Sequence, residues 1–237
     1  NAGSRSLTAT YSGDSQFNGS TSPSQAHQVN RADTKMNLVS SPNPGTQGQS
    51  VIFTATVTVV APGSGTPTGK VSLQNGVNTV AEVNIGPSGV VTFSDTINTP
   101  GTYAMKSIYQ GDPNYYASDL FNLNQKIKAN TTTSLAVAPN PSLFGQSVTF
   151  TVTVISASGT PTGTVTFKEL GTPLYTATLS SGMATFATAA LLVGIHDITA
   201  EYNGNIDFVE SSNQVTQVVN KAETTTALVS SVNSARF

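Results

Sequence analysis

Two histidines, His27 and His196, are the first residues to consider for catalysis, because an imidazole can act as a general base near neutral pH. A hydrolytic triad needs a base, a nucleophile and an orienting acid, and the sequence offers no such set around either histidine. His196 follows the alternation of Ile198, Ala200 and Tyr202, which indicates a place against the core or at its edge. The chain has no cysteine, which excludes cysteine nucleophiles, thiolate metal sites and disulfides. We therefore expect no enzymatic activity and no catalytic residues.

A turn flanked by two aromatic residues occurs three times, at residues 11–17, 109–115 and 202–208. Each copy carries Gly-Asp or Gly-Asn between its aromatic residues, and Asp112 and Asn114 belong to the second copy. Carboxylate and amide oxygens in a glycine-containing loop are typical calcium ligands. However, no loop matches the 12-residue calcium pattern, and Asp and Asn also stabilise turns by bonding to their own backbone. We expect no metal and no cofactor, while the calcium interpretation of Asp112 and Asn114 stays open.

The aromatic residues of these turns suggest a second kind of chemistry, the stacking of a sugar or a protein side chain. The alternative is that they hold the end of the last hairpin against the core, since aromatic side chains bury large areas. Tyr109 and Tyr202 share the inward parity of the strands that precede them, which favours this structural role.

Composition limits the remaining function classes. Hydrophobic residues make up 37% of the 237 residues and charged residues only 9%, with a net charge of −2. No basic field is available to attract nucleic acid or an anionic membrane surface. No apolar run approaches the roughly 20 residues of a membrane-spanning helix. We therefore expect neither nucleic-acid binding nor membrane insertion.

The aromatic turns recur at a spacing of roughly 95 residues, which is the size of a small domain and indicates tandem repeats. Other segments recur with them: Pro-Asn-Pro at 42–44 and 139–141, and Gly-Thr-Pro-Thr-Gly at 65–69 and 159–163. The pattern predicts two complete domains, at 33–129 and 130–222. It also predicts the C-terminal strands of a partial domain at 1–32 and the first strand of another at 223–237.

Each complete repeat contains about seven short alternating segments separated by Pro and Gly turns, the signature of a β-sandwich. The clearest segment is 51–59, where apolar residues alternate with Thr. The inward parity predicts a core made of Val51, Phe53, Val57, Val71, Leu73, Phe93, Met105 and Tyr109, and of Val148, Phe150, Val154, Val165, Phe167, Phe186, Ile198 and Tyr202.

The recurring motifs, taken together, resemble the bacterial immunoglobulin-like repeat family of long cell-surface proteins. They are Pro-Asn-Pro, Gly-Gln-Ser-Val-Xaa-Phe-Thr, Gly-Thr-Pro-Thr-Gly-Xaa-Val and Tyr-Xaa-Gly-Asp/Asn. The resemblance implies an all-β chain of tandem immunoglobulin-like sandwiches, secreted or held at the cell surface, and it brings no catalytic residues. The joints between repeats have no Gly or Pro, so we expect the sandwiches to form a semi-rigid rod.

Two functions are compatible with this reading. The favoured one is a structural spacer in an extracellular array, whose partners are neighbouring domains of the same chain or of adjacent subunits in an appendage or filament. The alternative is an adhesin-type module that binds a glycan or protein through end loops. Its best candidates are Tyr115-Tyr116 and the insertion Ala61-Pro62-Gly63.

The predicted partial domains raise a question about assembly. Leu7, Ala9 and Tyr11 form an apolar face that residues 1–32 cannot bury alone, and open strand edges favour pairing with other chains. We expect the missing strands to lie in a longer polypeptide; the alternative is that the ends dock on another subunit.

Overall fold

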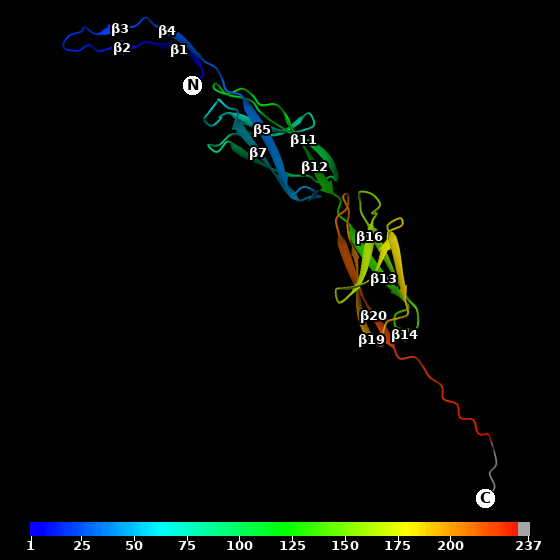
Figure 1. Cartoon of the computed structure of the whole chain (residues 1–237). Helices are drawn as coiled ribbons and strands as arrows, with labels where there is room; N and C mark the ends of the chain where they lie inside the picture. Colours follow the sequence, from blue (N-terminus) through cyan, green and yellow to red (C-terminus); the bar gives the residue numbers. More distant parts are fainter. Residues whose placement is uncertain (232–237) are drawn as a thin grey trace. The chain divides into compact units, whose positions relative to one another are not determined.

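The computed structural model describes residues 1–231, which contain twenty β-strands and no helix (Figure 1). The chain divides into two compact units, Asn1–Lys128 and Ala129–Phe237. Each unit holds one β-sandwich, and the first unit also holds an N-terminal hairpin. Without a helix, the described residues have no helical segment that could cross a membrane.

The sandwich of the first unit, called sandwich 1, packs a three-stranded sheet on a five-stranded one. The smaller sheet has the order β10 (Val90–Thr96), β7 (Ser50–Val59) and β5 (Thr34–Ser41). The larger sheet has the order β6 (Gly45–Thr46), β12 (Phe121–Lys128), β11 (Gly101–Tyr109), β8 (Lys70–Asn75) and β9 (Asn78–Asn84). All pairings are antiparallel except the short one between β6 and β12.

The second unit repeats this topology in sandwich 2. Its smaller sheet has the order β13 (Thr132–Ala138), β15 (Val148–Ile155) and β18 (Met183–Thr188). Its larger sheet has the order β14 (Ser142–Leu143), β20 (Ser211–Asn220), β19 (Gly194–Tyr202), β16 (Thr164–Glu169) and β17 (Thr172–Thr178). β19 lies between β16 and β20, so the aromatic turn that follows β19 stands at the end of the two longest strands of this sheet.

The N-terminal hairpin consists of four short strands: β1 (Gly3–Leu7), β2 (Thr10–Tyr11), β3 (Ser20–Thr21) and β4 (Gln25–Val29). β1 pairs with β4 and β2 with β3, both antiparallel. At the other end, residues 221–231 belong to no strand and are exposed. The first strand predicted for 223–237 is therefore not formed within 223–231, and residues 232–237 lie outside the described part.

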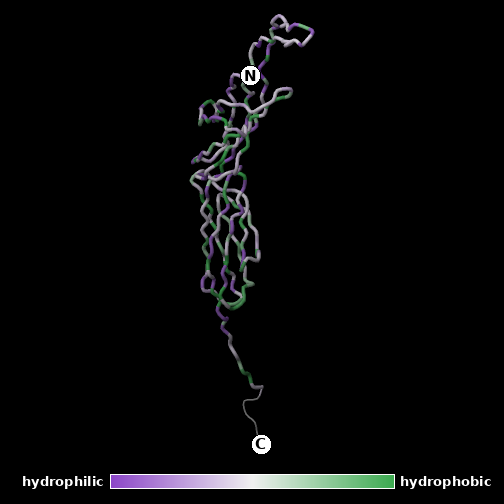
Figure 2. Tube along the Cα trace, turned by 90° about the vertical axis from the view of Figure 1, so that its left-hand side faces the viewer, coloured by the Kyte–Doolittle hydropathy of each residue, from purple (hydrophilic) through white to green (hydrophobic). Residues whose placement is uncertain are grey.

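The cores follow the inward parity of the strands. In β7 the residues alternate between buried and accessible from Val51 to Val57, as the pleat of a strand requires. Figure 2 shows hydrophobic and hydrophilic residues interspersed along the chain. All the predicted core residues are buried with one exception, Phe186, which is only half-buried. Its ring stacks on Tyr175 and lines an open cleft, whereas its counterpart Phe93 is fully enclosed.

The predicted fold class, all-β with tandem sandwiches, is confirmed by these two sheet pairs. Each sandwich has its own cluster of buried apolar side chains, and neither needs a disulfide to close it.

Candidate functional site

The aromatic turns have a self-contained geometry that the sequence repeats three times. In sandwich 1, Asp112 Oδ1 accepts hydrogen bonds from the backbone N–H groups of Asn114 (2.7 Å) and Tyr115 (2.9 Å). Asn205 in sandwich 2 and Asp14 in the hairpin accept the same pair of bonds from the residues two and three positions later. These bonds form an Asx turn, which requires only the local Gly-Asp or Gly-Asn sequence.

In both sandwiches a threonine of the Gly-Thr-Pro-Thr-Gly loop covers the turn. The backbone N–H and the hydroxyl of Thr68 donate to Asp112 Oδ2, at 2.8 and 2.6 Å. The hydroxyl of Tyr109 donates to the carbonyl of Thr68 (2.7 Å), and Tyr202 makes the same bond to Thr162 (2.7 Å). Burial, and to a lesser degree the nearby Asp112 carboxylate, raise the pKa of Tyr109. The two tyrosines are therefore buried clamps, as the strand parity favours.

The same hydrogen bonds bear on whether Asp112 could be a calcium ligand. Both oxygens of Asp112 are occupied by protein donors, two on each oxygen. Sandwich 2 has the amide of Asn205 at this position, and its nitrogen donates to Thr162. Among the described residues, no group of three or more acidic, histidine or cysteine side chains gathers in one place. The geometry of the turn thus favours the backbone-capping interpretation of Asp112.

Each aromatic turn also binds the segment that enters its sandwich. The N–H of Ala32 donates to the carbonyl of Asn114 (3.0 Å), and the N–H of Tyr116 donates to the carbonyl of Ala32 (2.9 Å). In sandwich 2, Ala129 makes the same two bonds, with Asp207 (2.8 Å) and Val209 (2.9 Å). An alanine that precedes the first strand is therefore held as a short parallel bridge against the turn.

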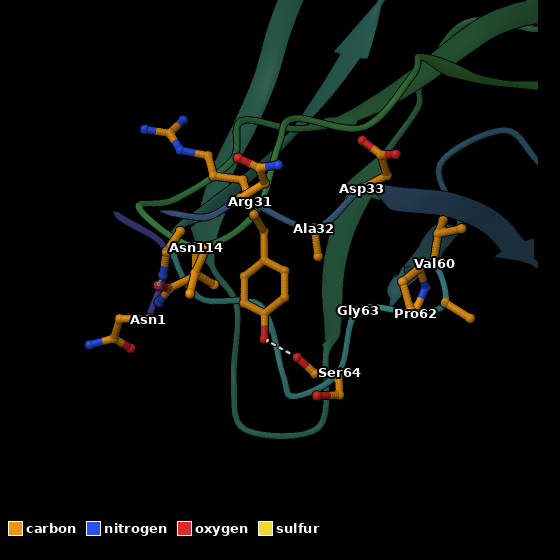
Figure 3. Close-up of a pocket in the computed structure, with 14 residues that line it drawn as sticks. Asn1, Arg31, Ala32, Asp33, Val60, Pro62, Gly63, Ser64 and Asn114 are labelled. Carbon is orange, nitrogen blue, oxygen red and sulfur yellow. Dashed lines mark hydrogen bonds between the residues drawn. The ribbon is translucent and has the colours of Figure 1, made fainter. Parts of the chain in front are cut away.

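Of the loop features expected to mark a binding module, the insertion and Tyr115 line one cavity of about 520 Å³ (Figure 3), and Tyr116 is not part of its lining. The insertion Ala61-Pro62-Gly63 and the ring of Tyr115 line it, together with Arg31 and Ala32. The hydroxyl of Tyr115 donates to the carbonyl of Ser64 (2.8 Å), the dashed line in Figure 3. The aromatic ring thus holds the insertion in place, which is a structural task.

Sandwich 2 has a cleft of about 590 Å³ that reasoning from the sequence did not find. Its walls are mainly apolar, from Leu174, Phe186 and Leu192, and it ends at an ion pair between Glu169 Oε1 and His196 Nδ1 (2.6 Å). Sandwich 1 has Asn75 and Tyr103 at the positions of this pair, so the pair is specific to the second repeat.

His196 lies at the edge of the core, as predicted. Its Nε2 faces the carbonyl of Leu192 at 2.8 Å, so both ring nitrogens face acceptors. Only the imidazolium carries two N–H groups and can satisfy both. Burial lowers the pKa of His196, but the Leu192 carbonyl and the Glu169 carboxylate outweigh it and raise the pKa. No hydroxyl contacts the ring, and His27 is exposed on β4, so the described residues show no triad at either histidine.

Sequence reasoning therefore found the aromatic turns but missed the partners that give them a role. Thr68 and Thr162 were visible only as parts of a recurring loop, and the recurrence of that loop together with the turn is the signal that could have paired them. Ala32 and Ala129 recur in the same way, each after a basic residue at the joint.

The family model of the bacterial Ig-like domain (group 3) matches residues 38–128 and 135–220. None of the curated proteins matches the chain.

Solved structures with the same kind of fold include fibronectin(III)-like modules of Clostridium thermocellum CbhA, at 19% identity and a TM-score of 0.45, covering 82% of this chain and 100% of theirs. A 282-residue C-terminal fragment of intimin, in complex with the intimin-binding domain of its translocated receptor, has 11% identity and a TM-score of 0.48, covering 77% and 63%. The Yersinia pseudotuberculosis adhesin InvE has 17% identity and a TM-score of 0.33, covering 81% and 65%. The family match itself covers most of both sandwiches, and the chain therefore belongs to the bacterial Ig-like domain family, group 3.

Proposed function

We propose that this chain is a structural segment of an extracellular bacterial array, in which Ig-like sandwiches act as spacers between other parts of a surface protein. The observation that carries the proposal is the alanine bridge at the start of each sandwich. A linker whose first residue is already hydrogen-bonded into the following sandwich has little freedom to bend.

The joint residues support this proposal. β12 ends at Lys128, and the next residue, Ala129, makes both of its backbone hydrogen bonds to the aromatic turn of sandwich 2. The joint contains neither Gly nor Pro and is far shorter than flexible linkers. We therefore propose a semi-rigid rod whose domains interact with their immediate neighbours.

Nuclear magnetic relaxation of ¹⁵N-labelled protein tests the proposal. A rigid joint makes the two sandwiches tumble together, so their relaxation rates fit one common diffusion tensor. A control variant carries a flexible Gly-Ser linker of about ten residues between Lys128 and Ala129, which should let each sandwich tumble on its own. If the natural chain and the linker variant relax alike, the chain is not a stiff spacer.

A second function, binding of a glycan or protein, is favoured by the cleft of sandwich 2. The ring of Tyr175 is half exposed and stacks on Phe186 with ring centroids 5.2 Å apart. An exposed, preformed aromatic stack beside an apolar cleft with one ion pair is a common arrangement of ligand sites. Sandwich 1 has Ala81 at the position of Tyr175, so the feature is not a requirement of the fold.

A glycan and protein binding screen with the whole chain tests this second function. Tyr175→Ala should remove any binding found, while Val77→Ala, a change at an exposed hairpin tip of sandwich 1, should leave it intact. Binding that survives Tyr175→Ala would exclude the stacked rings of Tyr175 and Phe186 as the site.

A further inference from the structure

The N-terminal hairpin copies the last hairpin of each sandwich. β1 and β4 pair Leu7 with Gln25, and β11 and β12 pair Met105 with Leu123 at the corresponding place. The hairpin also ends in the same Asx turn, formed by Asp14. The backbone of residues 3–31 thus has the register of two adjacent sandwich strands.

The side chains that this register directs inward are not covered. In the hairpin they are between 37% and 66% exposed, whereas their counterparts in sandwich 1 are at most 8% exposed. The exposed set, called the hairpin face, is Leu7, Tyr11, Phe17 and Val29, and the counterparts are Met105, Tyr109, Tyr115 and Ile127.

The polar atoms of the hairpin turn also lack the partners that they have in the sandwiches. The hydroxyl of Tyr11 donates to Asp14 Oδ2 at 2.7 Å. In sandwich 1 the corresponding hydroxyl and carboxylate oxygen both bond to Thr68 instead. In the hairpin the phenol hydroxyl and the carboxylate oxygen therefore bond to each other, whereas the same two groups in sandwich 1 bond to the backbone and hydroxyl of a threonine.

Sandwich 1 also shows which residue must follow that threonine in the sequence. Gly69 follows Thr68 with φ +89°, and a Cβ placed there would lie 2.9 Å from the carbonyl oxygen of Gly111 in the aromatic turn. Two residues later, Val71 pairs with Tyr109 in the antiparallel ladder. A segment that covers such a turn thus has the pattern Thr-Gly-Xaa-Val, with a glycine that no other residue replaces without strain.

We propose that the hairpin face binds an extended segment of the Gly-Thr-Pro-Thr-Gly-Xaa-Val type from another Ig-like repeat. The segment pairs antiparallel with the strand that ends at Tyr11, its threonine N–H and hydroxyl donate to Asp14, and its threonine carbonyl accepts from Tyr11. This inference rests on the proposed function, because such binding would join the hairpin to one more sandwich of an array. Main-chain pairing would supply affinity, and the Thr-Gly pattern would supply selectivity.

The segments of this chain outside its sandwiches do not have that pattern. Residues 223–229 repeat the first-strand sequence of sandwich 2 and contain no Thr-Gly pair. A second copy docking through this segment would therefore leave Asp14 and Tyr11 without the threonine contacts, and we expect it not to bind the hairpin face.

The experiment measures nitration of tyrosines in the 237-residue chain, with Tyr116 as the exposed reference and Tyr109 as the buried one. Two probes are used. One is a peptide with the sequence of residues 64–75, added in excess. The other is a fusion that places the sequence of residues 33–98 directly ahead of Asn1, which matches the register of sandwich 1.

We expect either probe to lower the nitration rate of Tyr11 by about tenfold or more, as for a residue that reacts only after local opening. The peptide carrying Thr68→Ala and Gly69→Val should give no protection. The proposal is overturned if Tyr11 stays as reactive as Tyr116 with both probes, or if the altered peptide protects equally well. Protection that rises with protein concentration without a probe would assign the face to a second copy and also overturn it. Relaxation at the Lys128–Ala129 joint is measured independently, so failure of one result leaves the other standing.

Discussion

The aromatic turn at residues 11–17 and the one at residues 109–115 share the backbone hydrogen bonds that close the turn, but their tyrosines have different partners and different exposure. Asp14 and Asp112 each close the turn with two backbone N–H groups. Tyr109 is buried and bonded to Thr68, whereas Tyr11 is half exposed and bonded to Asp14 of its own turn. The difference shows that local sequence forms the turn, while a loop about 40 residues earlier in the repeat gives it a structural role.

The largest expected difference between covered and uncovered turns is in stability. Tyr202→Ala should destabilise sandwich 2 by about 3–5 kcal/mol, because it leaves a cavity and removes the bond to Thr162. Tyr11→Ala should change stability by less than about 0.5 kcal/mol, as is usual for surface changes. Calorimetric melting of the whole chain measures both. Equal effects of the two substitutions would show that the covered turn does not clamp the core.

The stability of the two sandwiches should respond differently to acid, because of the residue at position 112 in sandwich 1. Burial raises the pKa of Asp112, but bonds from Thr68 and from the turn backbone outweigh it and lower the pKa. A carboxyl whose folded pKa is lowered contributes stability above its unfolded pKa of about 3.9, and this is lost as pH falls through the folded pKa. Sandwich 2 has Asn205 here, so Asp112→Asn should reduce the acid sensitivity of sandwich 1 only. Acid melting curves unchanged by Asp112→Asn would contradict this.

Sandwich 2 should show a smaller pH dependence of the opposite sign, with stability lost as the pH rises near neutrality. The folded pKa of His196 is raised, so its contribution is complete below the unfolded value of about 6.5 and is lost as pH rises through the folded pKa. His196→Tyr copies sandwich 1, where the hydroxyl of Tyr103 donates to Thr99, and should remove this dependence. The melting temperature of each variant between about pH 5 and pH 8 measures it. A dependence that persists in His196→Tyr would assign it to another group.

The smallest expected effect is that of a chelator. Both oxygens of Asp112 already accept hydrogen bonds from protein donors, so removal of divalent ions should leave the melting temperature unchanged. A fall in melting temperature that Ca²⁺ reverses and Mg²⁺ does not would instead make Asp112 and Asn114 calcium ligands.

Much of the fold could be predicted because alternation and turns are local properties. The period-2 pattern of residues 51–59 gave the correct inward parity, and Phe53 and Val57 are buried. The recurrence of whole motifs likewise indicated tandem sandwiches. Phe186 shows the limit of this reasoning, because its parity is inward but it lines a cleft and is only half-buried.

The parts of the candidate site that could not be predicted depend on contacts between distant segments. No local pattern connects Thr68 with Asp112, or Ala129 with Asp207. The pair of Glu169 and His196 is also non-local, since it forms only when β16 and β19 become neighbours in the sheet. Such contacts follow from topology, and the sequence alone offers only the recurrence of their parts.

Amide hydrogen exchange at the joints tests the central claim, that each aromatic turn locks the entering segment into its sandwich. Ala129 and Ala222 both follow a lysine, but among the described residues only Ala129 donates its N–H to a turn, at 2.8 Å, whereas Ala222 lies in no strand. We predict that the Ala129 amide exchanges as slowly as amides of the β19 strand, while the Ala222 amide exchanges at the rate of an unstructured peptide. Equally fast exchange at Ala129 and Ala222 would contradict the account.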